Sequence, residues 1–358
     1  MTIDIHTHFI PPSFVDEARR GRALDSITVS KKDDGEWLVH PQGYRYPLSP
    51  EFFEVDAKLR QMDGLGIDVS VLSLTPTLFF YWLDAGPTAE FCRLANDAVA
   101  QMAAQSGGRL FGMAVVPMQD PEAAATELRR AAAIGLRGVM IGTTIGDVPL
   151  DDARFTPFFA VAEELKAPVM LHPYYVGPRR QLGDFYMTNL TGNPLETCLA
   201  ATRLMLSGFF DRHPGLNVVL VHAGGFMPFQ SGRLDHGFRV RSETKTAITV
   251  KPSTYLRRFH YDTITHASTP LEFLTELVGV DRVMLGTDLP FDMADDRFDH
   301  YLREIGFDQT SLEAITSRNA IALYHLDGPA KAGHHENGPA EAGHHEDGPA
   351  EAGHDGRK

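Results

Sequence analysis

The chain has 358 residues, of which 43% are hydrophobic and 22% are charged, the composition of an ordinary globular protein. Its 33 basic residues stand against 47 acidic residues, and the net charge of -14 argues against a nucleic-acid-binding protein. Two cysteines are too few for a disulfide-stapled secreted domain, and no apolar run reaches the ~18 residues of a membrane span. From the residues at 1–6, which are neither basic nor strongly apolar, we expect no signal segment, a cytoplasmic protein and no membrane partner.

Residues 1–326 alternate between short β-rich runs and longer helical stretches. We expect eight strands, at 2–6, 68–74, 109–115, 138–141, 168–172, 217–222, 260–264 and 282–287. We expect helices between them at 87–106, 121–134, 153–166, 194–213 and 270–278. This succession predicts an α/β fold, a (β/α)₈ TIM barrel. The alternative, a doubly wound open sheet, needs a glycine-rich turn after its first strand, where this chain has His6-Thr7-His8.

Two insertions and a tail interrupt the alternation. Residues 9–50, after the first strand, contain Trp37-Leu38-Val39 and Tyr44-Arg45-Tyr46, which indicate a small hairpin, and residues 173–193 indicate a long loop. Both would lie at the mouth of the barrel where the carboxyl ends of the strands meet, the place where active sites are built. Residues 327–358 contain a ten-residue repeat in which alanine is almost the only apolar residue. Such a composition predicts a disordered tail that lies outside the domain at 1–326.

Four of the predicted strands end in residues that can bind a metal. Period-two spacing places both imidazoles of His6-Thr7-His8 on one side of the first strand. His172, His222 and Asp288 end the fifth, sixth and eighth strands. A buried strand end avoids ionisable groups unless they are paired or ligated, so their shared position indicates a metal site. The alternative is a set of hydrogen-bonded polar core residues.

This motif order resembles the amidohydrolase superfamily, whose members hold divalent metal ions in a distorted (β/α)₈ barrel. Members with two metal ions place a carboxylated lysine at the end of the fourth strand, where this chain has Gly-Val-Met-Ile-Gly at 138–142. The resemblance therefore implies the single-metal branch. The ion would be held by His6, His8, His172 and Asp288, a ligand set that favours Zn²⁺, with Mn²⁺ as the alternative.

Within that branch, several segments resemble the amino-carboxymuconate-semialdehyde decarboxylases. The residues at 44–47 match the segment that carries a substrate-binding arginine in these enzymes. The residues at 232–235 match the segment whose arginine reaches the active site of a neighbouring subunit. The resemblance thus implies that Arg45 and Arg233 bind a substrate carboxylate, to which a planar guanidinium is suited, and that the enzyme is a homodimer. The alternatives are an exposed position in a polar hairpin for Arg45, and an ion pair with Asp235 or simple solvation for Arg233.

The resemblance implies a metal-dependent, non-oxidative decarboxylase of an unsaturated or aromatic carboxylic acid, either amino-carboxymuconate-semialdehyde-like or hydroxybenzoate-like. The expected catalytic residues are Asp288 and His222, the latter as general base and then proton donor. Phe291 and Tyr186 are candidates for the pocket wall, with plain packing as the alternative. Two other functions stay open: a hydrolase or hydratase of a small carboxylated substrate on the same barrel, and a non-enzymatic metal-binding protein.

Overall fold

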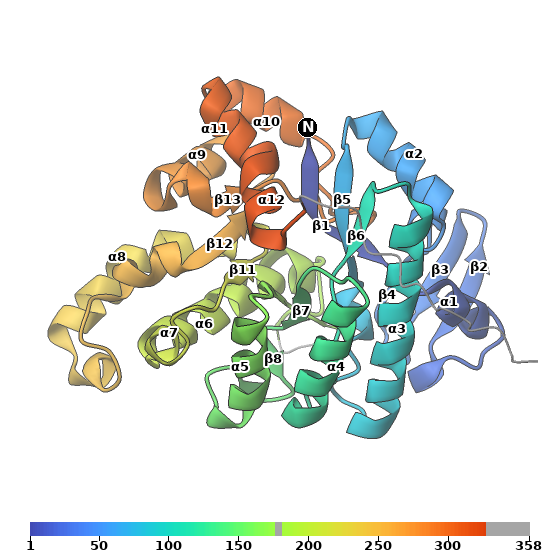
Figure 1. Ribbon diagram of the computed structural model, residues 1–358, viewed down its shortest axis with the longest axis horizontal. Helices are drawn as coiled ribbons and strands as arrows, with labels where there is room; N and C mark the ends of the chain where they lie inside the picture. Colours follow the sequence, from blue (N-terminus) through green and yellow to red (C-terminus); the bar gives the residue numbers. More distant parts are fainter. Residues whose placement is uncertain (176–180, 327–358) are drawn as a thin grey trace, which may run out of the picture.

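The structure is a computed structural model that describes residues 1–175 and 181–326, in which parallel strands form the centre and helices lie around them (Figure 1). One sheet has three parallel strands, β1 (Ile3–Phe9), β5 (Val69–Leu74) and β6 (Leu110–Gly112), in the order β1-β5-β6. A second sheet has five, in the order β13-β12-β11-β10-β7. Its strands are β7 (Val139–Gly142), β10 (Val169–His172), β11 (Val218–Leu220), β12 (Phe259–Asp262) and β13 (Val283–Met284). Each predicted strand overlaps one of these.

Backbone hydrogen bonds join the two sheets at both of their junctions. Next to β6, the amide of Ala114 donates to the carbonyl of Gly138 (2.8 Å), and the amide of Met140 donates to the carbonyl of Ala114 (2.9 Å). At the other junction, the amide of Ile5 in β1 donates to the carbonyl of Leu285, just after β13 (2.9 Å). Since all neighbouring strands of the two sheets are parallel, their carboxyl ends lie on the same side of the molecule.

The predicted helices are confirmed, with two corrections to their limits. They correspond to α3 (Ala85–Gln105), α4 (Pro121–Ala133), α5 (Thr156–Glu164), α6 (Asn193–Leu206) and α9 (Ser268–Val278). The stretch 153–166 begins as a 3₁₀ turn, and α5 starts only at Thr156, with proline in its first turn. The stretch 194–213 is broken at Gly208, whose left-handed backbone (φ 69°) separates α6 from α7 (Phe209–Arg212).

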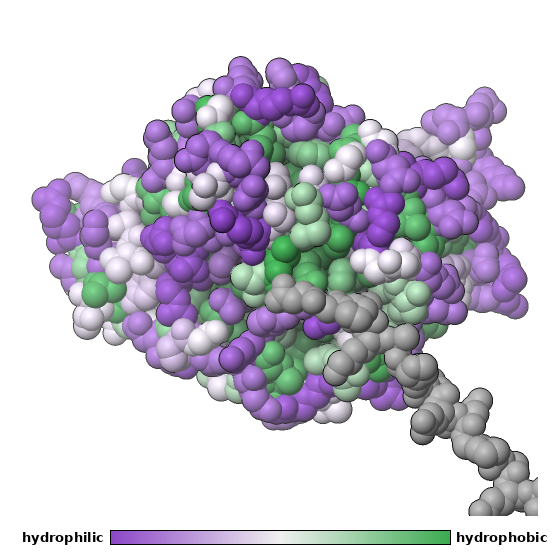
Figure 2. Space-filling view, turned by 45° about the horizontal axis from the view of Figure 1, so that its top comes forward, coloured by the Kyte–Doolittle hydropathy of each residue, from purple (hydrophilic) through white to green (hydrophobic). Residues whose placement is uncertain are grey.

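Further helices complete the outer layer (Figure 1). They are α1 (Pro12–Arg19), α2 (Val55–Leu65), α8 (Met227–Val240), α10 (Phe298–Ile305), α11 (Gln309–Glu313) and α12 (Asn319–Tyr324). The surface in Figure 2 is largely hydrophilic, with apolar residues gathered towards the middle of that face. No helix of the described residues is long and apolar enough to cross a membrane.

The insertion after β1 contains the predicted hairpin and one strand more. Strands β2 (Thr28–Lys32), β3 (Gly35–Val39) and β4 (Arg45–Pro47) form an antiparallel sheet in the order β2-β3-β4. Tyr46 of β4 is buried and packs edge-on against Phe291, with the ring centres 5.1 Å apart. The insertion therefore covers one side of the strand ends. The predicted loop at 173–193 lies partly, and the predicted disordered tail at 327–358 wholly, outside the described residues.

Candidate metal centre and active site

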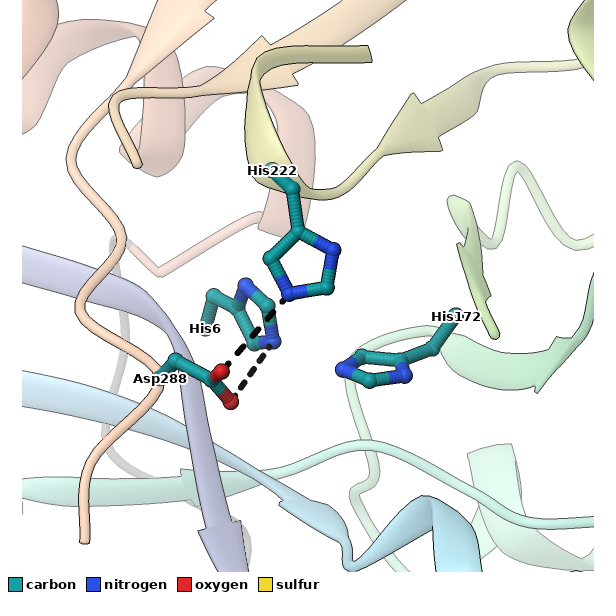
Figure 3. Close-up of side chains that lie close together, drawn as sticks. All are labelled: His6, His172, His222 and Asp288. Carbon is teal, nitrogen blue, oxygen red and sulfur yellow. Dashed lines mark ion pairs between the residues drawn. The ribbon is translucent and has the colours of Figure 1, made fainter. Parts of the chain in front are cut away.

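The residues predicted at the strand ends come together at one point (Figure 3). Single nitrogen or oxygen atoms of His6, His172, His222 and Asp288 all lie within 4.8 Å of one another, which is close enough to hold a metal ion. His8 lies beside them, with its Nε2 atom 3.2 Å from Nε2 of His6 and 2.8 Å from Oδ1 of Asp288. The structure thus brings all four predicted ligands and the predicted general base into one cluster.

Three of the histidines direct Nε2 into the cluster because a neighbouring group holds their Nδ1 atom. The partners of Nδ1 are Asp262 Oδ2 for His6 (2.7 Å), Ser73 Oγ for His8 (3.1 Å) and the Pro173 carbonyl for His172 (2.6 Å). The hydroxyl of Ser73 donates to the Thr7 carbonyl, so it accepts the proton of His8 Nδ1. Nε2 of His172 is buried and has no hydrogen-bond partner among the described residues. Lone pairs of the three Nε2 atoms therefore converge next to a carboxylate, a donor set that fits a divalent metal ion.

His222 differs from the other three histidines. Its Nδ1 atom has no hydrogen-bond partner among the described residues, and its Nε2 atom lies 3.6 Å from Oδ2 of Asp288. Its side chain is 15% exposed, whereas those of His6 and His8 are fully buried. His222 also lines the cavity beside the cluster, so its ring can reach a bound molecule.

The electrostatics of the cluster also suit a cation. Burial lowers the pKa of His8 to about 4 and that of His172 well below its ordinary value, so both rings are neutral at neutral pH. Burial alone would raise the pKa of Asp288, but its interactions with His222, His8 and His6 outweigh burial and hold that pKa well below the usual range. Burial likewise opposes protonation of His6, yet the surrounding carboxylates raise its pKa, which indicates surplus negative charge in the cluster.

Two cavities adjoin the cluster on either side of Asp288. The larger, of about 650 Å³, includes His222 and is lined mainly by apolar residues of α6, α8, α9 and the segments next to them. They include Leu190, Phe226, Phe229, Ile264, Phe273 and Met293. The smaller, of about 40 Å³, is lined by several aromatic side chains and by His172. None of the described residues that line either cavity is Lys or Arg. Besides the cluster, a bound molecule would meet mainly apolar and aromatic walls with a few polar groups among them, such as Asn189, Thr265 and His266.

The structure places two of the predicted substrate-binding residues next to the cluster. Phe291 and Tyr186 both line the smaller cavity. The ring of Phe291 lies 5.2 Å from the ring of His8, and the hydroxyl of Tyr186 donates to Asp292 at 3.1 Å. Their positions are those of a pocket wall.

The two predicted arginines lie elsewhere. Arg45 is exposed, outside both cavities, with its guanidinium 6.0 Å from the ring of Trp37. Since alternate side chains of a strand point to opposite faces, the packing of Tyr46 towards Phe291 turns Arg45 away from the cluster. Arg233 is exposed on α8 and lines neither cavity.

Asp262 is a site residue that the sequence pattern did not indicate. Its carboxylate accepts the hydrogen bond of His6 Nδ1 and is fully buried. The predicted strand at 260–264 extended two residues past it, whereas β12 ends at Asp262. The rule that selected His172 and Asp288, an ionisable residue ending a buried strand, selects Asp262 once the strand end is placed correctly.

The chain is similar to known proteins over most of its length. The sequence profile of the family described as Amidohydrolase matches residues 3–326. The chain is 30% identical to 2-amino-3-carboxymuconate-6-semialdehyde decarboxylase of Dictyostelium discoideum, over 91% of this chain and 92% of that protein. Among solved structures, 5-carboxyvanillate decarboxylase of Sphingomonas paucimobilis is similar with a TM-score of 0.76 and 28% identity, over 90% of this chain and 98% of that one. Dihydroxybenzoic acid decarboxylase of Polaromonas sp. JS666, with bound manganese and 2-nitroresorcinol, is similar with a TM-score of 0.73 and 26% identity, over 91% of this chain and 97% of that one. The predicted family is confirmed: the chain belongs to the amidohydrolase family.

Proposed function

We propose that this protein is a metal-dependent, non-oxidative decarboxylase of a small aromatic or unsaturated carboxylic acid. The observation that carries the proposal is the cluster of three inward-facing Nε2 atoms and the Asp288 carboxylate beside an apolar cavity of about 650 Å³. The relatives named above are themselves decarboxylases of carboxylic acids. The protein is an enzyme of the carboxy-lyase class, in agreement with the prediction from the sequence.

We infer that residues 1–326 form one domain, a distorted (β/α)₈ barrel. Support comes from the backbone hydrogen bonds at both junctions between the sheets, which leave neither sheet with a fully unpaired edge there. The family match over residues 3–326 also covers nearly the whole of this unit.

The proposed metal ligands are His6, His8, His172 and Asp288. A metal-ligating histidine almost always donates its other ring N–H to a neighbouring acceptor, a condition that the three histidines meet and His222 does not. Three imidazoles and one carboxylate suit Zn²⁺, and the manganese bound by the Polaromonas relative makes Mn²⁺ the other candidate. When bound, the ion supplies a positive charge that withdraws electron density from a substrate oxygen.

His222 is the proposed proton-transfer residue. Loss of CO₂ leaves an electron pair on the carbon that carried the carboxylate, and this carbon must then receive a proton. The ring of His222 reaches the cavity, and its Nδ1 atom is not committed to a partner among the described residues, so the ring is free to exchange protons. Phe226, Ile264 and Phe273 form apolar walls that would exclude water from the flat substrate.

The experiment that tests the function is an assay of CO₂ release. The purified full-length protein, loaded with Zn²⁺ or Mn²⁺, would be supplied with hydroxybenzoates, methoxylated hydroxybenzoates and carboxymuconates. We expect CO₂ release with at least one of these acids and loss of the activity after chelation. Hydrolysis of the corresponding esters or lactones without any CO₂ release would instead identify a hydrolase and refute the proposal.

We also infer a homodimer in which Arg233 reaches the neighbouring subunit's site. The helix that carries Arg233, α8, begins at the cavity, where Phe226 and Phe229 are 42% and 80% exposed and thus available to a partner. Asp235 is bonded to Ser253 and Lys251, and it makes no ion pair with Arg233 among the described residues.

Substitution of Arg233 by alanine is expected to raise KM about 10- to 100-fold with little change in kcat, since a charged hydrogen bond to a substrate carboxylate is lost. Steady-state kinetics measure this effect, and Arg239→Ala on the same helix serves as the matched control. Mixing Arg233→Ala chains with His222→Ala chains should restore activity, because one site of the mixed dimer combines an intact His222 with the partner's intact Arg233. Mixed dimers without recovered activity, or a fully active monomer, would contradict this arrangement.

We infer a cytoplasmic location. The support is that both cysteines, Cys92 and Cys198, are free thiols, as is usual in a reducing compartment. Cell fractionation tests this placement, which would be overturned by recovery of the protein outside the cytoplasm.

A further inference from the structure

We propose that Asp262 is a positioning residue that uses one carboxylate to fix both the metal-facing nitrogen of His6 and the backbone that carries His222. The inference rests on the proposed function for the roles of these two histidines. It goes further in assigning a single side chain, at the end of β12, to the alignment of the ligand and the proton-transfer residue with each other.

Four N–H groups surround the carboxylate of Asp262. Oδ2 lies 2.7 Å from Nδ1 of His6 and 2.9 Å from the amide nitrogen of His222. Oδ1 lies 2.7 Å from the amide of Ala223 and 3.2 Å from the amide of Ile264. The side chain is fully buried, so water does not compete for these positions. An ionised carboxylate accepts about four hydrogen bonds, and here the acceptor positions are filled by the protein itself.

This arrangement determines which nitrogen of His6 faces the cluster with a lone pair. Because the carboxylate can only accept, Nδ1 of His6 must carry the proton that is donated to it. Nε2 then presents its lone pair towards His8 and Asp288, 3.2 Å and 3.5 Å away. In the other tautomer, a proton on Nε2 would point into the cluster and exclude a cation.

The same carboxylate holds a backbone conformation that side chains rarely adopt. His222 and Ala223 follow β11 with φ values of 53° and 54°, in the left-handed region that costs free energy for residues other than glycine. The amides of both residues donate to Asp262, which compensates for that cost. The turn carries the ring of His222 to the edge of the cavity. Asp262 therefore fixes the proton-transfer residue relative to the ligand it also orients.

Asp4 provides a matched comparison on β1. It is another fully buried carboxylate, and it accepts hydrogen bonds from the amide of His6 and from the amide and hydroxyl of Thr287. It makes no hydrogen bond to an imidazole ring among the described residues. Asp4→Asn thus removes a buried charge next to the same histidine without altering the partner of Nδ1.

The test is the Asp262→Asn variant, in which an NH₂ group replaces one of the two acceptor oxygens. Since both oxygens accept hydrogen bonds from N–H groups, the NH₂ group would face N–H donors in either orientation of the amide. The full chain would be stripped of metal with a chelator and titrated with Mn²⁺ and with Zn²⁺. We expect metal affinity to fall by about 10- to 100-fold in Asp262→Asn, the range for removal of an outer partner of a ligating histidine. Hydrogen exchange of the 222–223 amides should accelerate as well. Asp4→Asn should retain the affinity within a fewfold.

A second measurement uses the wild-type protein and does not depend on the folding of a variant. Nitrogen-15 NMR of the histidine-labelled, metal-free protein, recorded at a pH at which the His6 ring is neutral, should show its single proton on Nδ1. A neutral His6 ring with its proton on Nε2 would overturn the proposal, as would wild-type metal affinity combined with unchanged amide exchange in Asp262→Asn. None of these readouts requires turnover. Absence of CO₂ release would refute the proposed function but would not affect the role of Asp262 in metal binding. Conversely, unchanged metal affinity and amide exchange in Asp262→Asn would refute that role and leave the proposed decarboxylase activity untouched.

Discussion

Replacement of His222 by alanine is expected to lower kcat by about 10²- to 10⁴-fold while the protein keeps its metal ion. That range is what a positioned general acid or base contributes. The expectation follows from the contrast within the cluster, where His222 is the histidine whose Nδ1 atom has no partner among the described residues and whose ring reaches the larger cavity. Steady-state kinetics with the substrate identified by CO₂ release, together with elemental analysis of the same sample, measure both quantities.

The result distinguishes a proton-transfer residue from a metal ligand. Judged by distance alone, His222 could also be a metal ligand, since one of its ring nitrogens lies within 4.8 Å of ligand atoms of His6, His172 and Asp288. Loss of the metal ion from His222→Ala would support that reading and contradict the proposed role. His236→Ala is the control, because His236 is an exposed histidine on α8 whose ring contacts Arg239 outside the cluster. It should change kcat by less than about twofold.

The strand-end residues could be predicted because they depend only on local periodicity. His6 and His8 face the same side because strand side chains alternate, and His172 follows a run of apolar residues that can be buried only in a sheet. Parallel pairing then brings the ends of strands far apart in the sequence to one edge. Periodicity and parallel pairing are both contained in the sequence, so they are sufficient to predict the cluster.

The placement of Arg45 could not be predicted in the same way. Alternation along β4 requires that Arg45 and Tyr46 face opposite sides, but it does not say which side faces the cluster. That choice depends on the packing of Tyr46 against Phe291, a residue about 245 positions later in the chain. Asp262 was missed for a different reason, because β-propensity continues through Thr263 and Ile264 although the ladder stops at Asp262.

The end of β7 shows how packing supports a single-metal site. Gly142 ends β7 and lies in register with His172 of β10. A Cβ atom on Gly142 would approach the ring of Tyr174 to 2.5 Å, so no longer side chain fits there without displacement of that ring. The family resemblance implies that two-metal members would carry their carboxylated lysine at this strand end. The sequence at 138–142 contains no lysine, and the ring of Tyr174 leaves no room for one at Gly142. Both observations therefore support a site for a single metal ion.

Replacement of Asp288 by asparagine is expected to abolish metal binding and, with it, the activity. Asp288 is the one anionic group among the four proposed ligands, and its carboxylate contacts His8 at 2.8 Å and His6 at 3.5 Å. Loss of an outer partner of a ligating histidine already weakens binding about 10- to 100-fold, so loss of the anionic ligand should exceed about 100-fold. Elemental analysis should find about one divalent ion per wild-type chain and almost none in the variant.

Thermal unfolding gives a readout of the same prediction that is independent of activity. An ion that binds only the native state stabilises it by about 2.7 kcal/mol at a free concentration of 100 Kd, so saturating Mn²⁺ or Zn²⁺ should raise the Tm of the wild-type protein by several degrees. The Tm of Asp288→Asn should not respond to either ion. Asp295→Asn is the matched control, since Asp295 is a buried carboxylate in the same segment that bonds to the amide of Arg297 and belongs to no ligand set. It should lower the Tm yet preserve the shift with metal. A metal-dependent shift that survives in Asp288→Asn would mean that the histidines alone hold the ion, and the assignment of Asp288 as a ligand would then be wrong.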